Sequence, residues 1–323
     1  MGQSMRFFKI LIPVFVLVSV AYILFQKHED SVPGSPLSVV VTIKPIHSLV
    51  CGVAKGVFEP ALLIDGAISP HTYSPAPNDV QALRAADLVI WVGSIYETHM
   101  QNTIEKTVPM PKIVTLSKGE GVTLYSPRKE SYFEGEFEEA HHTHGPNVEG
   151  HDGHVWLDPA NAILFVQEIA RALSRADAFH AKQYEQNAAQ VIKEIKALDE
   201  SLQERLKPIR QKPYLLYHDS MQYFDKHFGT QAIGAITMEP GHPPRAQHFM
   251  RLKVLLSDKS APFHPLCLFT EPQFENDMTI NLAEEFSIPY SMLDYLGQDV
   301  AQGPKAYFDI MNQLADSLLK GLS

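Results

Sequence analysis

The sequence predicts an α/β fold with two similar parallel-sheet lobes bridged by one long rigid helix. Short apolar runs alternate with helix-length amphipathic segments, which is typical of a parallel sheet covered by helices. This rhythm occurs twice, once in each half of the chain. A helical pattern of about 30 residues separates the two halves, which is long enough to run along both lobes.

The first segment predicts export from the cytoplasm. Arg6 and Lys9 precede the apolar run 10–25, and a polar stretch follows. As a helix this run would span ~24 Å, slightly short of a ~30 Å hydrocarbon core. We therefore interpret residues 1–26 as a signal peptide or N-terminal anchor and favour cleavage. No cysteine follows the run directly, so a lipid anchor is not expected.

Charge and cysteine content exclude some classes of protein. The 323 residues include 27 basic and 37 acidic side chains, a net charge of −10, which is unfavourable for binding nucleic acid. Cys51 lies in an apolar helix-like stretch and Cys267 in a predicted strand of the other half. We expect two separate buried thiols and no disulfide.

The first lobe is predicted to span residues 38–157 and the second residues 209–323. Strands are expected near residues 38–43, 58–64, 87–92 and 112–116, and again near residues 214–217, 231–236, 266–269 and 290–293. Candidate helices of the second lobe cover residues 245–257 and 280–286.

Linking helices are predicted over residues 158–208. Asp158 and Pro159 provide an N-cap and a first-turn proline for one helix. A longer helix is expected from about Asp177 to Lys207. Its apolar residues recur every three or four positions, so one stripe faces the protein. These residues are Tyr184, Ala188, Val191, Ile195, Leu198, Leu202 and Leu206. A continuous helix of this kind predicts a stiff connector.

Residues 126–153 interrupt the rhythm. This stretch is charged, contains glycine and histidine, and lacks a core-forming period. We interpret it as a mobile surface loop at the end of the first lobe.

Four positions are candidates for a metal site. Isolated histidines are usually satisfied surface or core residues, so position must select among the 15 in this chain. His71 lies in a Pro/Ser-rich loop after a predicted strand, and His154 lies just before the helix that Asp158 caps. His218 and Asp294 each follow an apolar run of the second lobe, at the strand ends where α/β sheets bind ligands. Three imidazoles and one carboxylate form the kind of four-coordinate site that Zn²⁺ accepts.

These residues also support a family resemblance. From about Val40 to the C-terminus the chain resembles the metal-specific solute-binding proteins of ABC importers, and among them the high-affinity zinc-binding branch. The matching segments are IKPIHSLV (43–50), LLIDGAISPHTYSPAPNDVQALRAADLVIWVG (62–93), HVWLDP (154–159), YHDSMQYFDKHFG (217–229), FTEPQF (269–274) and LDYLG (293–297). The resemblance implies two lobes with a metal in the cleft between them, docking onto a membrane permease, a periplasmic location and the ligands His71, His154, His218 and Asp294. We expect a monomer.

Other residues are expected to assist. The insertion resembles the His-rich loop of the zinc branch but is short, and we weigh a weak auxiliary zinc site against a solvated loop. Its histidines are His141, His142, His144 and His151. Glu271 is expected to orient a ligand by hydrogen bonding, and His47 and His242 to lie near the cleft.

Three alternatives to zinc delivery remain open. An exported zinc hydrolase would keep an open water position and a general base, but HExxH, GxSxG and a Gly-rich phosphate loop are absent from the sequence. A manganese-binding member is disfavoured by His218, which stands where manganese-type members of the resembled family have a glutamate. An adhesin with the same fold is not excluded by the sequence.

Overall fold

The computed structural model describes residues 37–129, 132–133, 150–237, 240–241, 244–258, 264–274 and 276–323. The predicted export segment and the residues His141, His142, His144 and His242 lie outside these ranges. Residues Leu37–Ser323 form one compact unit. Among the described residues, no helix is both long and apolar enough to cross a membrane.

Each lobe is built on a four-stranded parallel sheet with the same strand order. The first sheet has the order β2-β1-β3-β4, with β1 (Val39–Ile43), β2 (Ala61–Ile64), β3 (Leu88–Trp91) and β4 (Ile113–Thr115). The second has the order β6-β5-β7-β8, with β5 (Pro213–His218), β6 (Gln231–Thr237), β7 (Leu268–Thr270) and β8 (Tyr290–Met292). The predicted fold class is confirmed, and each of these strands overlaps a predicted one.

Helices connect the parallel strands, as such sheets require. The first lobe contains α2 (Lys44–Ala54), α3 (Pro77–Ala85) and α4 (Gln101–Thr107), and the second α7 (Gln222–Phe228), α8 (Ala246–Ser257), α9 (Asp277–Phe286) and α10 (Ala306–Leu322). In both sheets the second strand in sequence lies on one side of the first strand and the third on the other. This reversal creates a crevice at the carboxyl end of each sheet.

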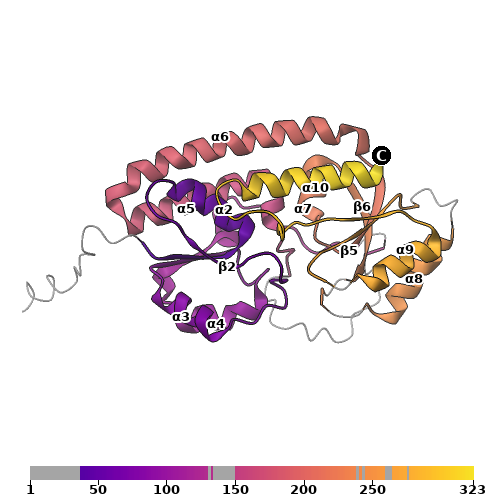
Figure 1. Cartoon of the computed structure of the whole chain (residues 1–323), viewed down its shortest axis with the longest axis horizontal. Helices are drawn as coiled ribbons and strands as arrows, with labels where there is room; N and C mark the ends of the chain where they lie inside the picture. The colour runs from indigo at the N-terminus through magenta and orange to yellow at the C-terminus, as the bar shows by residue number, and fades with distance from the viewer. Residues whose placement is uncertain are drawn as a thin grey trace, which may run out of the picture. The chain divides into compact units, whose positions relative to one another are not determined.

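Helices α5 (Pro159–Ala176) and α6 (Ala181–Leu206) link the lobes. Asp158 caps α5 by accepting a hydrogen bond from the Ala160 amide. The 26-residue helix α6 buries the apolar stripe predicted above, packs against α2, α5, α7 and α10, and extends along both sheets (Figure 1). It starts later than predicted, because Asp177 accepts from the His180 amide and closes a 3₁₀ turn over Ala178–His180.

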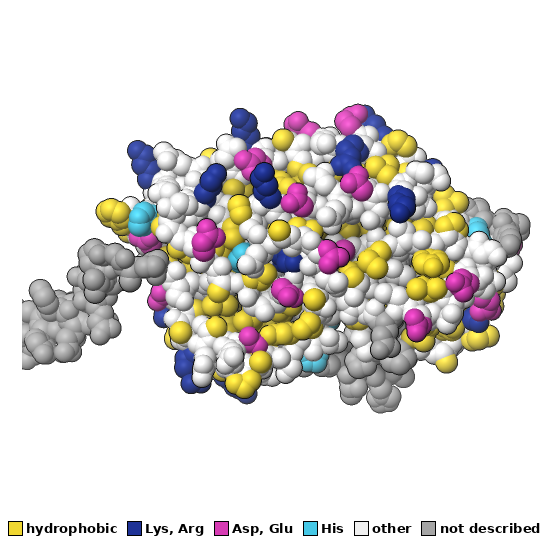
Figure 2. Space-filling view, in the orientation of Figure 1, with side chains coloured by type: hydrophobic (Ala, Val, Ile, Leu, Met, Phe, Trp, Pro, Cys, Tyr) yellow, Lys and Arg dark blue, Asp and Glu magenta, His cyan; other side chains and the backbone are white. Residues whose placement is uncertain are grey.

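The core is continuous between the lobes. One cluster of buried side chains includes strand β1, helices α2, α5, α6 and α10, and part of strand β5. A smaller cluster lies under α8 and α9 in the second lobe. The outer side of α6 carries interspersed acidic and basic side chains (Figure 2), as expected of a solvated helix face. Cys51 and Cys267 are free and buried, as predicted.

The ends of the predicted surface loop are packed against the rest of the protein. Phe133 is 2% exposed and Asp152 8% exposed, and Tyr132 forms a parallel β-bridge with Gly234 of strand β6. The prediction of a surface loop is therefore wrong for these residues. The apolar side chains of Tyr132 and Phe133 are too few to produce a period, so the sequence pattern did not reveal their packing.

Candidate metal centre

His218 is the last residue of β5 and lies beside the crevice of the second sheet. Glu271 directly follows β7, the neighbouring strand. The Glu271 Oε1 atom lies 2.7 Å from His218 Nδ1 and also accepts from the His218 amide. Both side chains are almost fully buried. Two adjacent strand ends thus fix this imidazole with its Nε2 free for another partner.

His154 is held in the same way by a residue that the sequence did not indicate. Asp152 Oδ1 lies 2.8 Å from His154 Nδ1 and accepts a hydrogen bond from the His154 amide at 2.9 Å. Gly153 lies between them, and a Cβ atom there would stand 2.6 Å from the carbonyl oxygen of Ile95. The His154 backbone therefore lies tightly against the first lobe.

His71 comes from the loop after β2. It is half-buried, whereas His154 and His218 are 3% and 2% exposed. Its loop is tied to the second lobe through Gly66, whose carbonyl accepts a hydrogen bond from Gln273 at 2.8 Å. His71 is therefore the most accessible of the three imidazoles.

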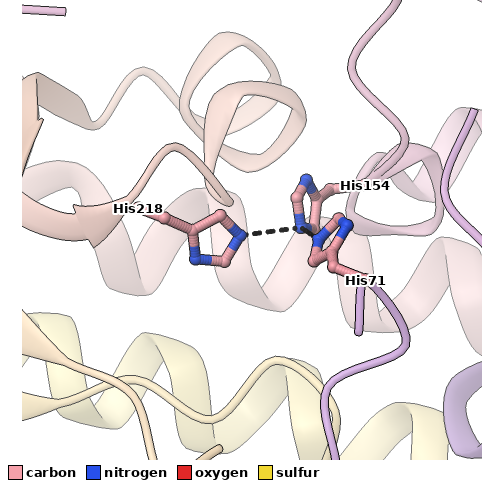
Figure 3. A group of neighbouring side chains, drawn as sticks. All are labelled: His71, His154 and His218. Atoms are coloured by element: carbon pink, nitrogen blue, oxygen red, sulfur yellow. Dashed lines mark hydrogen bonds between the residues drawn. The ribbon is translucent and has the colours of Figure 1, made fainter. Parts of the chain in front are cut away.

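The three histidines converge through their Nε2 atoms (Figure 3). His154 Nε2 lies 3.2 Å from His218 Nε2 and 3.4 Å from His71 Nε2. Because Asp152 and Glu271 accept hydrogen bonds from Nδ1–H, the facing Nε2 atoms of the neutral His154 and His218 rings carry lone pairs. Two lone pairs at this distance repel each other unless a cation lies between them. One candidate ligand atom from each histidine lies within 4.8 Å of the other two. Among the described residues, no other group of three or more His, Cys, Asp or Glu side chains meets this criterion.

Aromatic rings enclose this group. Tyr96 packs edge-on against His71 and His154, with centroids 4.7 and 5.1 Å apart. Tyr295 lies 5.2 Å from His154 and 5.7 Å from His218, and Trp156 packs against Tyr96. These rings exclude water and restrict rotation of the imidazoles.

Burial shifts the protonation of the site toward neutral forms. It lowers the pKa of His71 and His154 well below the ordinary value, and the neighbouring imidazoles lower it further. Burial also raises the pKa of Asp152 to about 7. Neutral imidazole is the form that binds metal.

The structure does not bring Asp294 into this group. Asp294 Oδ1 accepts from the amides of Leu296 and Gly297, and its Oδ2 accepts from the Gln298 amide at 2.6 Å. Gln273 also donates to Oδ1, at 3.1 Å. The carboxylate thus organises the turn that follows β8.

Lys44, which the sequence analysis did not select, holds that same turn against the first lobe. Its ammonium group donates to the carbonyls of Gly297, Gln298 and Val300. No local pattern revealed this contact, because its partners lie more than 250 residues away in sequence.

The remaining predicted residues have separate environments. His47 Nε2 donates to the Pro60 carbonyl at 3.0 Å, and its ring also contacts Cys51, so its nitrogens are engaged within the first lobe. His151 is half-buried and directly precedes Asp152. Glu271 lies where a supporting residue was predicted. Asp152 could have been suspected from its place two residues before His154.

Comparison with known proteins identifies the family. The family model described as ZnuA, zinc-uptake complex component A, periplasmic, matches residues 39–321. The chain belongs to the ZnuA family. It is 34% identical to the high-affinity zinc uptake system protein ZnuA of Brucella suis biovar 1, over 91% of this chain and 94% of that protein. The predicted family resemblance is confirmed.

Solved structures share the fold. A crystal structure of ZnuA superposes with a TM-score of 0.72 at 22% identity, covering 90% of this chain and all of that one. The periplasmic zinc-binding protein TroA from Treponema pallidum gives a TM-score of 0.73 at 18% identity, with the same coverage. These likenesses show that the chain shares the fold of both proteins.

Proposed function

We propose that this protein captures Zn²⁺ outside the cytoplasm and delivers it to an ABC-type permease. The observation that supports this most directly is the convergence of three Nε2 atoms, two of them on imidazoles oriented by buried carboxylates. Imidazole nitrogen suits Zn²⁺ better than the harder Mn²⁺. The zinc-uptake family and the relatives named above support the same cargo.

The proposed ligands are His71, His154 and His218. In this proposal Asp294 does not bind the ion but stabilises the turn after β8 by accepting hydrogen bonds from its amides. Three histidines with an open fourth position also occur in catalytic zinc sites. Here, however, the group is enclosed by Tyr96 and Tyr295, which suits retention of an ion rather than turnover of a substrate. The protein acts as a carrier without chemistry of its own, as a monomer.

Metal analysis of the purified protein tests the proposal. After dialysis, mass spectrometry is expected to find about one tightly bound Zn²⁺ per chain, and calorimetry with a competing chelator gives its affinity. Preferential retention of manganese would overturn the zinc assignment. Laminin or cell binding with no effect of zinc would favour an adhesin instead.

A His218→Glu variant tests metal choice. We expect the variant to bind zinc more weakly and to show a smaller difference between its affinities for zinc and manganese, because a carboxylate oxygen replaces an imidazole. Titration of both metals in the same buffer measures this gap. Retention of the full zinc preference would show that His218 does not determine selectivity.

A further inference from the structure

Residues 125–129, with Tyr132 and Phe133, cross from the first lobe to the second, and we call them the clamp segment. Arg128 is its main anchor. The Arg128 Nε atom donates to both carboxylate oxygens of Asp219 at 2.9 and 3.1 Å, and Nη1 donates to Asp225 at 2.7 Å. The three side chains are only 14%, 7% and 5% exposed. The planar guanidinium contacts the two carboxylates through different nitrogens in a fixed geometry, whereas a lysine has one nitrogen for both.

A second anchor is the backbone of Tyr132. Its amide donates to the Ile233 carbonyl at 3.0 Å, and its carbonyl accepts from the Ala235 amide, so it extends the sheet beyond β6. Gly234 permits this approach, since a Cβ atom there would lie 2.6 Å from the Tyr132 Cβ. Phe133 lies under the Arg128 guanidinium, whose carbon is 4.2 Å from the ring centroid.

The clamp segment contacts the chain beside both buried ligands. Asp219, which Arg128 holds, directly follows His218. At the other end, the Tyr125 carbonyl accepts from the Asp152 amide at 2.8 Å. The Tyr223 hydroxyl of α7 joins the same two residues, accepting from the Tyr125 amide and donating to the Asp152 carbonyl. Asp152 in turn orients His154.

We propose that Arg128 is a positioning residue that fixes His154 relative to His218 through the clamp segment. The two histidines are 64 residues apart, and their ligating atoms lie 3.2 Å from each other. The clamp segment connects the backbone on either side of this pair, so the pair is organised without help from the ion. Preorganisation of this kind lowers the cost of binding and slows release. This inference rests on the proposed zinc function.

Two variants test the clamp segment in different ways. Arg128→Lys keeps the positive charge but removes the planar guanidinium that contacts both Asp219 and Asp225. Gly234→Ala displaces Tyr132 without changing any charge. We expect each to release Zn²⁺ about tenfold faster than wild type, the size of effect seen when supporting residues of metal sites are changed. The visible spectrum of Co²⁺ bound in place of Zn²⁺ is expected to change, because it reports ligand geometry rather than stability.

Arg205→Lys is the matched control for Arg128→Lys. Arg205 also uses its guanidinium to join two elements, donating to Asn312 and Asp316 of α10, but it has no link to the histidine group. The Zn²⁺ release rate of this control variant is expected to stay within about twofold of wild type, compared with the tenfold effect above. Its Co²⁺ spectrum is expected to be that of wild type.

The outcomes separate the two proposals. If wild type binds no zinc, the proposed function fails. If wild type binds zinc and His154→Ala weakens it, but Gly234→Ala and Arg128→Lys keep the wild-type rate and spectrum, only the positioning role is overturned. If Arg128→Lys does not fold, Gly234→Ala decides alone.

Discussion

The buried pair His154–His218 and the more accessible His71 differ in how they are supported. Each member of the pair directs Nδ1 to a carboxylate, Asp152 or Glu271, and is nearly inaccessible to solvent. His71 lies on a loop and is half-buried. In the proposed zinc site, this difference predicts that the pair forms a rigid half-site and that the ion enters and leaves past His71.

Ligand removal should give the largest effect. Structural zinc binding contributes about 10–16 kcal/mol, shared here among the three proposed ligands, so loss of His154 should weaken zinc binding by about 100-fold or more. We expect His71→Ala to weaken it less, because a solvent-accessible position can recruit water in place of the imidazole. Calorimetry with chelator competition compares the two. An equal loss of zinc affinity in the two variants would contradict the distinction between the buried pair and His71.

The orienting carboxylates come next. Asp152→Asn and Glu271→Gln are each expected to lower zinc affinity about 10- to 100-fold, because the paired imidazole loses its acceptor. Asp177→Asn is the matched control, since Asp177 makes the same contact to His180 Nδ1 at 2.6 Å, at the opposite end of α5 from His154. An effect of the control as large as that of the site variants would mean that general stability, not orientation, is being measured.

The pH dependence of binding sharpens the comparison further. Burial raises the pKa of Asp152 to about 7 and lowers that of His154, so the neutral forms of both side chains are favoured. A proton taken up near pH 7 must be displaced by zinc, so affinity should fall as pH decreases. We expect about tenfold per pH unit between pH 7 and 5.5, the slope for one coupled proton. A flat titration measured under the same salt would show that zinc binding does not displace the Asp152 proton.

Two variants of Asp294 test whether this residue binds zinc or stabilises the turn after β8. Asp294→Asn keeps an oxygen acceptor for the Leu296 and Gly297 amides, so zinc affinity should change less than about threefold. Asp294→Ala removes all acceptors and should lower the free energy of unfolding by about 1–2 kcal/mol. Thermal denaturation and zinc titration of both variants measure these quantities. A 100-fold loss of affinity in the Asn variant would restore Asp294 as the fourth ligand.

The smallest expected effect lies outside the site. His227 Nδ1 is 3.0 Å from Asp158, and Nε2 is 2.7 Å from Asp199. Burial alone would lower the pKa of His227, but these carboxylates raise it above the ordinary value. The resulting stabilisation is therefore full below about pH 6.5 and is lost as pH rises through the raised pKa. His227→Gln should cost about 1 kcal/mol at pH 6 and less at pH 9, with zinc affinity unchanged. Equal costs at both pH values would exclude an ionic contribution.

The sequence by itself determined the lobes, the strands and the three histidines. Alternation of apolar runs and helical patterns is a local property. Ile64 ends a strand of the first sheet, and His218 and Thr270 end neighbouring strands of the second, each at the carboxyl edge of its own sheet. The buried stripe of α6 follows from its period in the same way. Family motifs then selected histidines from among many.

Only the tertiary structure decided how those histidines are held. Arg128 lies in a stretch that has no period, so nothing local distinguished it from solvated residues. For Asp152, the one local sign was its place two residues before His154. Asp294 follows a strand as a ligand would, yet the amides of its own turn and Gln273 occupy its carboxylate. The contact from Gln273 depends on how a segment distant in sequence packs beside this carboxylate, and most buried acceptors in proteins find a donor. Whether a carboxylate binds an ion or accepts hydrogen bonds from the protein therefore depends on the groups that the tertiary structure places around it, and the spacing of residues in the sequence does not reveal these groups.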